Sequence, residues 1–149
     1  MRLTTRSRYG TRMVLDIAMH CSSGPVRIGD IAKRQGLSIK YLEKLIRELK
    51  KGGFITSKRG PGGGHTLAME PEKISVGAVV RSLEGEAGLV ECLENDTQCQ
   101  RIEQCPTREV WVKASQAMYE ALDKISIADL LKEGSFCTKT NPLFSEQLP

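Results

Sequence analysis

The sequence predicts a mainly α-helical fold that carries one small β-hairpin. Apolar residues recur at helical spacing in several segments, and two short alternating segments flank a glycine-rich loop. Aromatic residues make up only 5% of the chain, so leucine, isoleucine, valine, alanine and methionine must form the core. The length of 149 residues is that of one domain with a single core.

The first predicted element is an amphipathic helix over residues 7–21. Its apolar residues share one side at helical spacing: Tyr9, Met13, Val14, Ile17 and Ala18. Arginines 6, 8 and 12 fall on its other faces. Ser22, Ser23 and Gly24 end this helix, and a turn with a short extended stretch is expected at Pro25 and Val26.

Two shorter helices are predicted next, over residues 28–35 and 39–51. Gly36 stands where a helix favours a left-handed terminal residue, and Ser38 is the expected N-cap of the second helix. The second helix is apolar on one face and rich in lysine and arginine around the rest. Two helices joined by so short a turn form a helix-turn-helix pattern.

A β-hairpin follows directly. Residues 54–58 and 65–69 alternate like strands, and residues 59–64, Arg-Gly-Pro-Gly-Gly-Gly, connect them. The loop does not fit a nucleotide-binding loop, because no Gly-Lys-Ser/Thr and no helix follow it. We interpret the hairpin as a wing with a cationic tip, so residues 1–72 are predicted to form a winged helix-turn-helix region.

Three further regions complete the prediction. Residues 73–106 contain a connecting helix and a polar, cysteine-bearing loop of about 20 residues, a length that is usually functional or disordered. Residues 107–134 form the longest helix and a short terminal helix, the latter beginning at a capping-box pattern from Ser126 to Asp129. Residues 135–149 show no periodicity, and we expect a flexible tail.

The charge of the chain is distributed unevenly. Residues 1–60 carry 14 lysines and arginines against 4 acidic residues, whereas residues 61–149 carry 8 against 14. A basic half predicts a polyanionic partner such as a nucleic acid. The alternative is a chance clustering of solvated charges.

Several classes of protein are excluded. No segment approaches the roughly 18 consecutive apolar residues of a membrane span. Residues 1–9 are basic and polar with no apolar stretch behind them, so we expect no secretory signal and a cytoplasmic location. His20 and His65 each stand alone, and no nucleophile–base set or carboxylate pair indicates an enzyme active site.

Three of the five cysteines are candidate metal ligands. Cys92, Cys99 and Cys105 follow the spacing C-x6-C-x5-C in the acidic loop, and thiolates are soft ligands that suit iron–sulfur clusters and zinc. The spacing is wider than that of the paired ligands of a zinc ribbon, which favours a cluster. The alternatives are zinc, redox-sensing thiols without a metal, and inert cysteines. A thiol redox enzyme is not expected without a C-x-x-C motif. Cys21 is interpreted as a small apolar residue, and Cys137 lies in the tail.

Five segments together carry a resemblance to a known family. They are Arg2-Leu3-Thr4, Ser7-Arg8-Tyr9-Gly10, Asp30-Ile31-Ala32, Leu37-Ser38-Ile39-Lys40-Tyr41-Leu42-Glu43 and Arg59-Gly60-Pro61-Gly62-Gly63-Gly64. In this order, over residues 1–133 and with the three-cysteine loop behind them, they resemble the IscR-type regulators of the Rrf family. The family consists of bacterial winged-helix transcription regulators that sense iron–sulfur status, nitric oxide, iron or cysteine supply.

The resemblance implies a homodimeric repressor that binds a palindromic site on double-stranded DNA. Its recognition helix and wing imply this set of DNA-contacting residues: Arg2, Ser38, Lys40, Tyr41, Glu43, Lys44, Arg47, Lys58, Arg59, Gly60, Pro61 and Gly62. It also implies that the long helix from Thr107 pairs with a second chain. The three cysteines match the family's cluster ligands, and we expect a [2Fe-2S] cluster, with [4Fe-4S] as the alternative.

The chain departs from the family at two positions. The cluster-assembly regulator has a histidine three residues after its third cysteine, where this chain has Arg108. The nitric-oxide-sensing branch uses an acidic residue near the N-terminus, where this chain has Arg8. A guanidinium offers iron no lone pair at any accessible pH, so neither arginine is an expected ligand.

Overall fold

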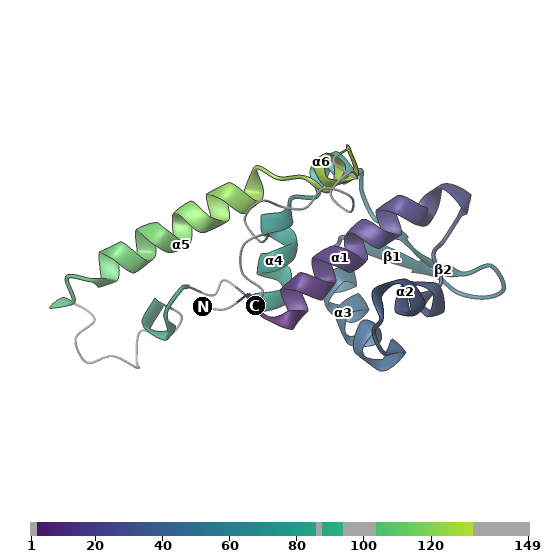
Figure 1. Cartoon of the computed structure of the whole chain (residues 1–149), viewed down its shortest axis with the longest axis horizontal. Coiled ribbons are helices and arrows are strands. Elements are labelled where there is room, and N and C mark those ends of the chain that lie inside the picture. Colours follow the sequence, from purple (N-terminus) through teal and green to yellow (C-terminus); the bar gives the residue numbers. More distant parts are fainter. Residues whose placement is uncertain (1–2, 86–87, 94–103, 133–149) are drawn as a thin grey trace, which may run out of the picture.

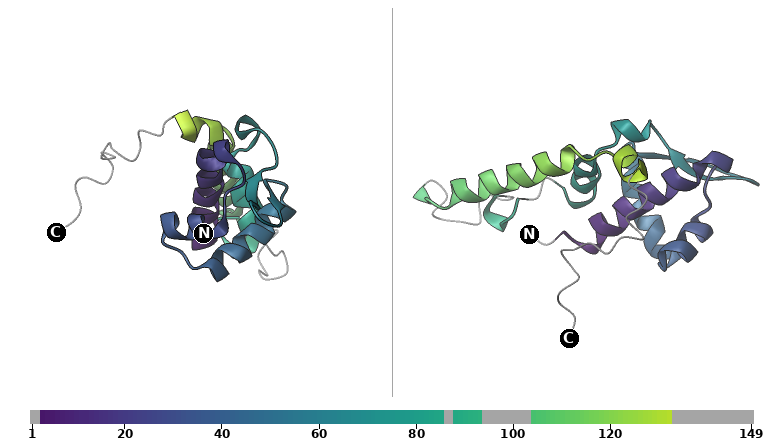
Figure 2. Two further views of the ribbon diagram at one scale, coloured as in Figure 1. Left: turned by 90° about the vertical axis from the view of Figure 1, so that its right-hand side faces the viewer. Right: turned by 45° about the horizontal axis from the view of Figure 1, so that its top comes forward.

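The computed structural model describes residues 3–85, 88–93 and 104–132. In chain order the main elements are α1 (Thr5–His20), α2 (Ile28–Gln35), α3 (Ile39–Lys51), β1 (Ile55–Lys58), β2 (Gly64–Leu67), α4 (Val76–Glu84), α5 (Arg108–Asp123) and α6 (Ile127–Lys132). Helices α1 to α4 and α6 pack together with the hairpin, whereas α5 and the hairpin tip extend toward opposite ends of the molecule (Figure 1). The two further views agree with this elongated arrangement (Figure 2).

The predicted mainly helical class with a small hairpin is confirmed. The second and third helices have the predicted bounds, and Gly36 adopts the left-handed conformation with φ 65° at the end of α2. The Ser38 hydroxyl accepts a hydrogen bond from the Tyr41 backbone N–H and so caps α3. Helix α1 begins two residues earlier than predicted because the Thr4 side chain caps it.

The two strands pair antiparallel, with Ile55 opposite Leu67 and Lys58 opposite Gly64. They are shorter than predicted at their outer ends. The extended stretch predicted at Val26 is a single bridge to His65. The hairpin is therefore held against the segment between α1 and α2 as well as against α3.

One hydrophobic core joins segments that are far apart in the sequence. The buried residues of α1, α2, α3 and β1 meet Ile74, Val79 and Leu83 around α4, and Ile127 from α6. Ile127 N–H donates to the Ile74 carbonyl at 2.8 Å, which ties the last helix to the segment that precedes α4. Residues beyond position 72 are thus part of the same core as the helix-turn-helix.

Helices α1 and α4 approach closely at Gly10. A β-carbon at this position would overlap Leu83, which is 1% exposed. One turn earlier in α1, the carboxylate of Glu84 accepts hydrogen bonds from the Thr4 N–H at 3.1 Å, the Thr4 hydroxyl at 2.5 Å and the Ser7 N–H at 3.2 Å. The last residue of α4 therefore holds the beginning of α1, where unpaired N–H groups favour a negative charge.

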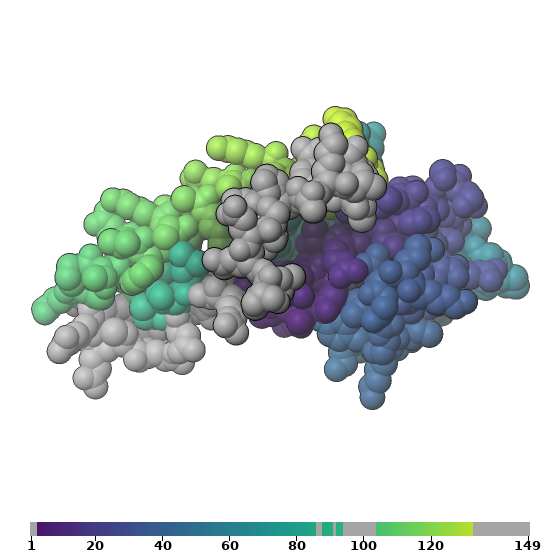
Figure 3. Space-filling model, viewed as in Figure 1, coloured from purple at the N-terminus to yellow at the C-terminus, as the bar shows by residue number. Residues whose placement is uncertain are grey.

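Helix α5 makes few contacts with the rest of the described chain. Ser115 is its one buried residue among those described, whereas Val110 and Trp111 are 56% and 41% exposed. Its C-terminal end is attached to α4, because the Arg81 guanidinium binds the Asp123 carboxylate with both terminal nitrogens and lies 4.5 Å from the Tyr119 ring centroid. Figure 3 shows how far α5 (green) extends from the blue and purple helices.

Among the residues that the structure describes, every helix is too short or too polar to span a bilayer.

We predict opposite effects for two glycine-to-alanine substitutions. Gly10→Ala should lower the free energy of unfolding by about 1–2 kcal/mol, because overpacking against a buried leucine outweighs the gain in helix propensity. Gly29→Ala, in the first turn of α2 with no atom within 4 Å of the new β-carbon, should raise it by up to about 1 kcal/mol. Denaturant unfolding of both variants tests the pair, and a Gly10→Ala variant as stable as the parent contradicts the close α1–α4 contact.

Candidate nucleic-acid interface and metal centre

A buried carboxylate on α1 positions the helix-turn-helix. Asp16 is 3% exposed and accepts hydrogen bonds from Arg34 at 2.6 and 3.0 Å and from the Gln35 amide at 2.8 Å. The Gln35 carbonyl oxygen in turn accepts from Arg12 Nε at 2.9 Å. The end of α2 is therefore attached to α1 by a chain of charged and amide groups.

The environment of Asp16 keeps it ionised. Burial alone would raise the pKa of the carboxyl, but the hydrogen bonds from Arg34 and Gln35 and the charge of Arg34 outweigh burial and hold the pKa below its ordinary value. A buried charge that is paired and hydrogen-bonded at several oxygens is stable in that position. A polar contact at the edge of the apolar core therefore joins α1 to the end of α2.

The candidate recognition helix α3 has one buried and one cationic side. Leu42, Leu45, Ile46 and Leu49 enter the core, whereas Lys40, Glu43, Lys44 and Arg47 are exposed. Within the described residues, no ion pair within 4 Å joins Glu43 to Arg47. The carboxylate of Glu43 is thus exposed among cations without a salt bridge to the arginine one turn away.

Tyr41 differs from the other predicted contacts on α3. It is half-buried, and its hydroxyl donates a weak 3.4 Å hydrogen bond to the Thr5 hydroxyl. Its ring packs edge-on against Tyr9 with 6.0 Å between centroids, and the guanidinium groups of Arg8 and Arg12 lie 5.6 and 5.4 Å from the Tyr9 centroid. Tyr41 therefore holds α3 against α1 beside a cationic surface.

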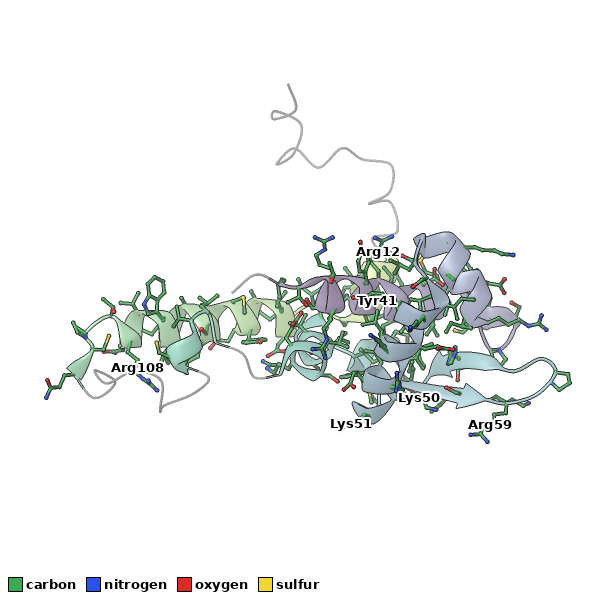
Figure 4. The ribbon with its side chains drawn as sticks, turned by 90° about the horizontal axis from the view of Figure 1, so that it is seen from below. Arg12, Tyr41, Lys50, Lys51, Arg59 and Arg108 are labelled. Carbon is green, nitrogen blue, oxygen red and sulfur yellow. The ribbon has the colours of Figure 1, made fainter. Side chains whose placement is uncertain are left out.

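The wing presents its arginine at an exposed tip (Figure 4). Gly60 and Gly62 have positive φ angles of 95° and 77°, and a β-carbon on Gly63 would overlap the Lys58 carbonyl oxygen. These conformations require glycine, so the loop turns within a few residues. Lys58, Arg59, Gly60, Pro61 and Gly62 are all exposed.

Helix α3 packs against β1, so the predicted contacts of α3 and of the wing lie on neighbouring elements, while Arg2 lies outside the described residues. Sequence reasoning missed Arg6, which lines a groove with Tyr41, Lys44 and Arg47 between α1 and α3. The only sign of this role in the sequence is a basic residue in the first turn of α1. Its proximity to α3 depends on helix packing that no local pattern reveals.

The cysteine region is described at two of its three cysteines. Arg108, the first residue of α5, donates from Nη1 to the Cys92 carbonyl at 2.9 Å, and its backbone N–H donates to the Cys105 carbonyl at 3.2 Å. Arg108 therefore links the backbones of Cys92 and Cys105, which are 13 positions apart in the sequence. Cys99 lies outside the described residues.

Cys92 and Cys105 are both free thiols of intermediate exposure. The Cys105 sulfur lies 3.3 Å from the Thr107 hydroxyl, and hydrogen bonding with Thr107 lowers the pKa of the Cys105 thiol, with a smaller contribution from the charge of Arg108. Among the described residues, which leave out Cys99, no three or more histidine, cysteine or acidic side chains are grouped to hold a metal ion.

The helix-turn-helix core, the cationic exposed side of α3 and the arginine-tipped wing define a winged-helix transcription regulator. A family model named Rrf2 and described as an iron-dependent transcriptional regulator matches residues 3–133. The chain belongs to the Rrf2 family of transcriptional regulators. Like its relatives, it is a transcriptional regulator and not an enzyme.

The chain is 55% identical over 139 residues to Protein rrf2 of Nitratidesulfovibrio vulgaris, strain Hildenborough, and the match covers 93% of each chain. It is 38% identical over 131 residues to the HTH-type transcriptional regulator IscR of Aliivibrio salmonicida, covering 88% of this chain and 77% of that one.

Solved structures of regulators share the fold. IscR of T. potens matches with a TM-score of 0.75 and 36% identity, over 96% of this chain and 95% of the other. CymR of B. subtilis, the global cysteine regulator, matches with a TM-score of 0.72 and 33% identity, over 89% and 98% of the two chains. The winged-helix prediction and the resemblance to IscR-type regulators are confirmed.

Proposed function

We propose that this regulator is a homodimeric repressor whose affinity for a palindromic DNA site is controlled by an iron–sulfur cluster on Cys92, Cys99 and Cys105. The observation that carries the proposal is the pairing of two features in one chain. An exposed cationic helix and wing form a surface for DNA, and Arg108 links the two described cysteines at the beginning of α5.

Helix α5 supports the dimer. None of its described residues belongs to the hydrophobic core, and it exposes Val110 and Trp111 to solvent. An apolar helix face of this kind is stabilised when a second copy covers it, and a two-fold axis makes the same face serve both chains. Two recognition helices then face two half-sites about 34 Å apart, or a multiple of that distance.

The DNA contact predicts a steep dependence on salt. For about eight phosphate contacts in the dimer, log K should fall against log salt with a slope near −7. Arg59→Ala should weaken binding mostly where the minor groove is narrow and rich in A·T pairs, because such grooves attract an inserted arginine. The measurement is a titration of a palindromic duplex, recovered by selection from random sequences, at several salt concentrations.

Lys124→Ala is a matched control, since this exposed lysine lies at the end of α5, away from α3 and the wing. It should bind the duplex like the parent. A salt slope near zero, or failure to select any palindromic sequence, would overturn the proposed DNA contact.

Glu43 is proposed to read a base. Its exposed carboxylate, without a salt bridge to Arg47 in the described structure, can accept a hydrogen bond from a cytosine amino group. Glu43→Ala should therefore relax the preference at one base pair by about 1–3 kcal/mol while other positions keep theirs. Selection of sites with the variant and the parent tests this, and an equal loss of affinity for every sequence would show that Glu43 reads nothing.

The cysteines fit a cluster by their chemistry. Thiolates are the usual ligands of iron–sulfur clusters, and a bound cluster supplies a centre that oxygen, nitric oxide or iron limitation can modify. Arg108 occupies the position where a histidine would complete the set, and it holds Cys92 through the peptide carbonyl instead of offering a ligand. We favour [2Fe-2S] over [4Fe-4S].

A second candidate uses the same DNA-binding module without a cluster. The likeness to CymR, described as a cysteine regulator, and the lowered pKa of the Cys105 thiol favour control by thiol redox chemistry, zinc or a protein partner. Freshly purified anaerobic protein separates the two candidates. Absorbance at about 320–420 nm with stoichiometric iron and sulfide indicates the cluster.

The substitution Arg108→His should slow loss of the cluster to chelator and air. An imidazole can bind iron where the guanidinium cannot, so the fourth position of the cluster would be less open to exchange. Arg108→Ala removes the hydrogen bond to Cys92 without adding a ligand, and it should lose the cluster at least as fast as the parent. Bleaching followed after matched anaerobic reconstitution compares all three proteins. If the histidine variant bleaches at the parent's rate, a protein ligand already fills that position.

A further inference from the structure

A groove of about 540 Å³ lies between α3 and the wing, with Ile28 and Ile46 at its apolar base and charged or polar side chains around them. On the α3 side it is lined by Glu43, Arg47 and Lys50, which follow one another at helical spacing along one stripe, and on the wing side by Ser57 and His65. Figure 4 shows Lys50 at this junction, between α3 and the hairpin that carries Arg59. None of the residues on the wing side belongs to the contacts predicted from sequence.

His65 is held rigidly on the wing side. Its backbone exchanges two hydrogen bonds of 2.8 Å with Val26, and its side-chain Nδ1 shares a 2.9 Å hydrogen bond with the hydroxyl of Ser57 on the opposite strand. No hydrogen-bond partner for Nε2 lies within the described part of the chain. Since no buried side-chain polar atom there lacks a partner, Nε2 faces the solvent of the groove.

The position of the groove determines what must occupy it in a complex with DNA. In the proposed function α3 enters the major groove and Arg59 enters the neighbouring minor groove. Neighbouring grooves of a duplex are separated by one sugar–phosphate strand, so that strand has to cross between α3 and the wing. The groove would then contain phosphodiester oxygens, within reach of the Lys50 ammonium and the His65 ring.

We propose that the groove between α3 and the wing is a phosphodiester-binding site in which His65 takes up a proton as DNA binds. The inference rests on the proposed DNA-binding function and deepens it. The imidazolium form has two N–H donors: Nδ1–H donates to the Ser57 hydroxyl and Nε2–H donates to a phosphate oxygen. The proton comes from solvent, and its positive charge is balanced by the phosphate.

The charges around His65 support proton uptake on binding and not before it. Burial lowers the pKa of the His65 imidazole, and the Lys50 cation lowers it further, so the ring is neutral in the free protein at pH 7. Arg47 adds a second cation from α3, whereas Glu43 contributes the one carboxylate that lines the groove. Helix α2 contributes Ile28, which carries no charge. A bound phosphate raises the pKa of the ring, so DNA affinity increases as the pH falls and declines as the pH rises through the raised pKa.

The experiment measures affinity for the selected palindromic duplex between pH 6 and 8, at constant salt, with the full chain. The parent should bind a few-fold more tightly per subunit at the acidic end, because one unit of pKa difference between bound and free ring reaches its full, about tenfold, effect only below the pKa of the free ring. His65→Gln keeps a side chain that hydrogen-bonds Ser57 and phosphate but cannot take up a proton, so its affinity should lose this pH dependence.

The second histidine of the chain provides a matched control. His20 lies at the end of α1, outside the groove, where its Nδ1 is 2.8 Å from the Asp16 backbone carbonyl oxygen and 3.7 Å from the Asp16 carboxylate, so a variant at His20 also reports any pH dependence that arises at Asp16. His20→Gln should keep the pH dependence of the parent. Nitrogen-15 NMR of the two imidazoles, with and without duplex, reports the His65 pKa directly and does not depend on how well the variant folds.

Three results would decide the matter. A higher His65 pKa in the complex, with a pH dependence lost in His65→Gln, supports the site. DNA binding with equal pH dependence in parent and His65→Gln, or an unchanged His65 pKa, overturns the groove proposal and leaves the DNA-binding function intact. Failure of the parent to bind any duplex at any pH overturns both.

Discussion

The buried carboxylate of Asp16 joins the first helix to the helix-turn-helix, and the placement of the recognition helix depends on that contact. Asp16 orients α2 through Arg34 and Gln35, α2 supports α3 across a short turn, and α3 in turn packs on the wing. Asp16 is buried whereas Arg34 reaches the surface, so the loss of Arg34 would leave a buried carboxylate without its cationic partner. The hydrogen bonds of the carboxylate are directional, so they add an orientation to the apolar packing of the same helices.

The elements that are defined by local chemistry could be predicted from sequence. Ser38 as an N-cap and Gly36 as a left-handed terminus lie within a few residues of the helices that they bound, and both are confirmed. The attachment of α4 and α6 to the same core as α1 could not be predicted. It depends on Leu83 meeting Gly10 and on Ile127 pairing with Ile74, contacts between residues that are 73 and 53 positions apart.

The candidate site shows the same division. The wing could be predicted because a run of glycines between two alternating segments indicates a tight turn. The cysteines could be identified as candidate ligands from their residue type and spacing alone. Sequence reasoning recognised Arg108 as a poor ligand but could not show what it does instead, which is to hold the Cys92 carbonyl. His65 looked isolated along the chain, since its partners Ser57, Val26 and Lys50 come from three other segments. Grooves are properties of packed surfaces, and no spacing rule in one segment describes them.

Glu84 connects the end of α4 to the beginning of α1. It is the last residue of α4, eight positions before Cys92, and it holds the first turn of α1 through three hydrogen bonds. Hydrogen bonds from Thr4 and Ser7 outweigh the effect of burial and keep the pKa of Glu84 below its ordinary value, so the attachment is ionic at neutral pH. The end of α4 and the beginning of α1 are therefore joined at one carboxylate. Because Ser7 and Asp16 lie on the same helix, about two and a half turns apart, α1 contacts the end of α4 at one end and the helix-turn-helix at the other.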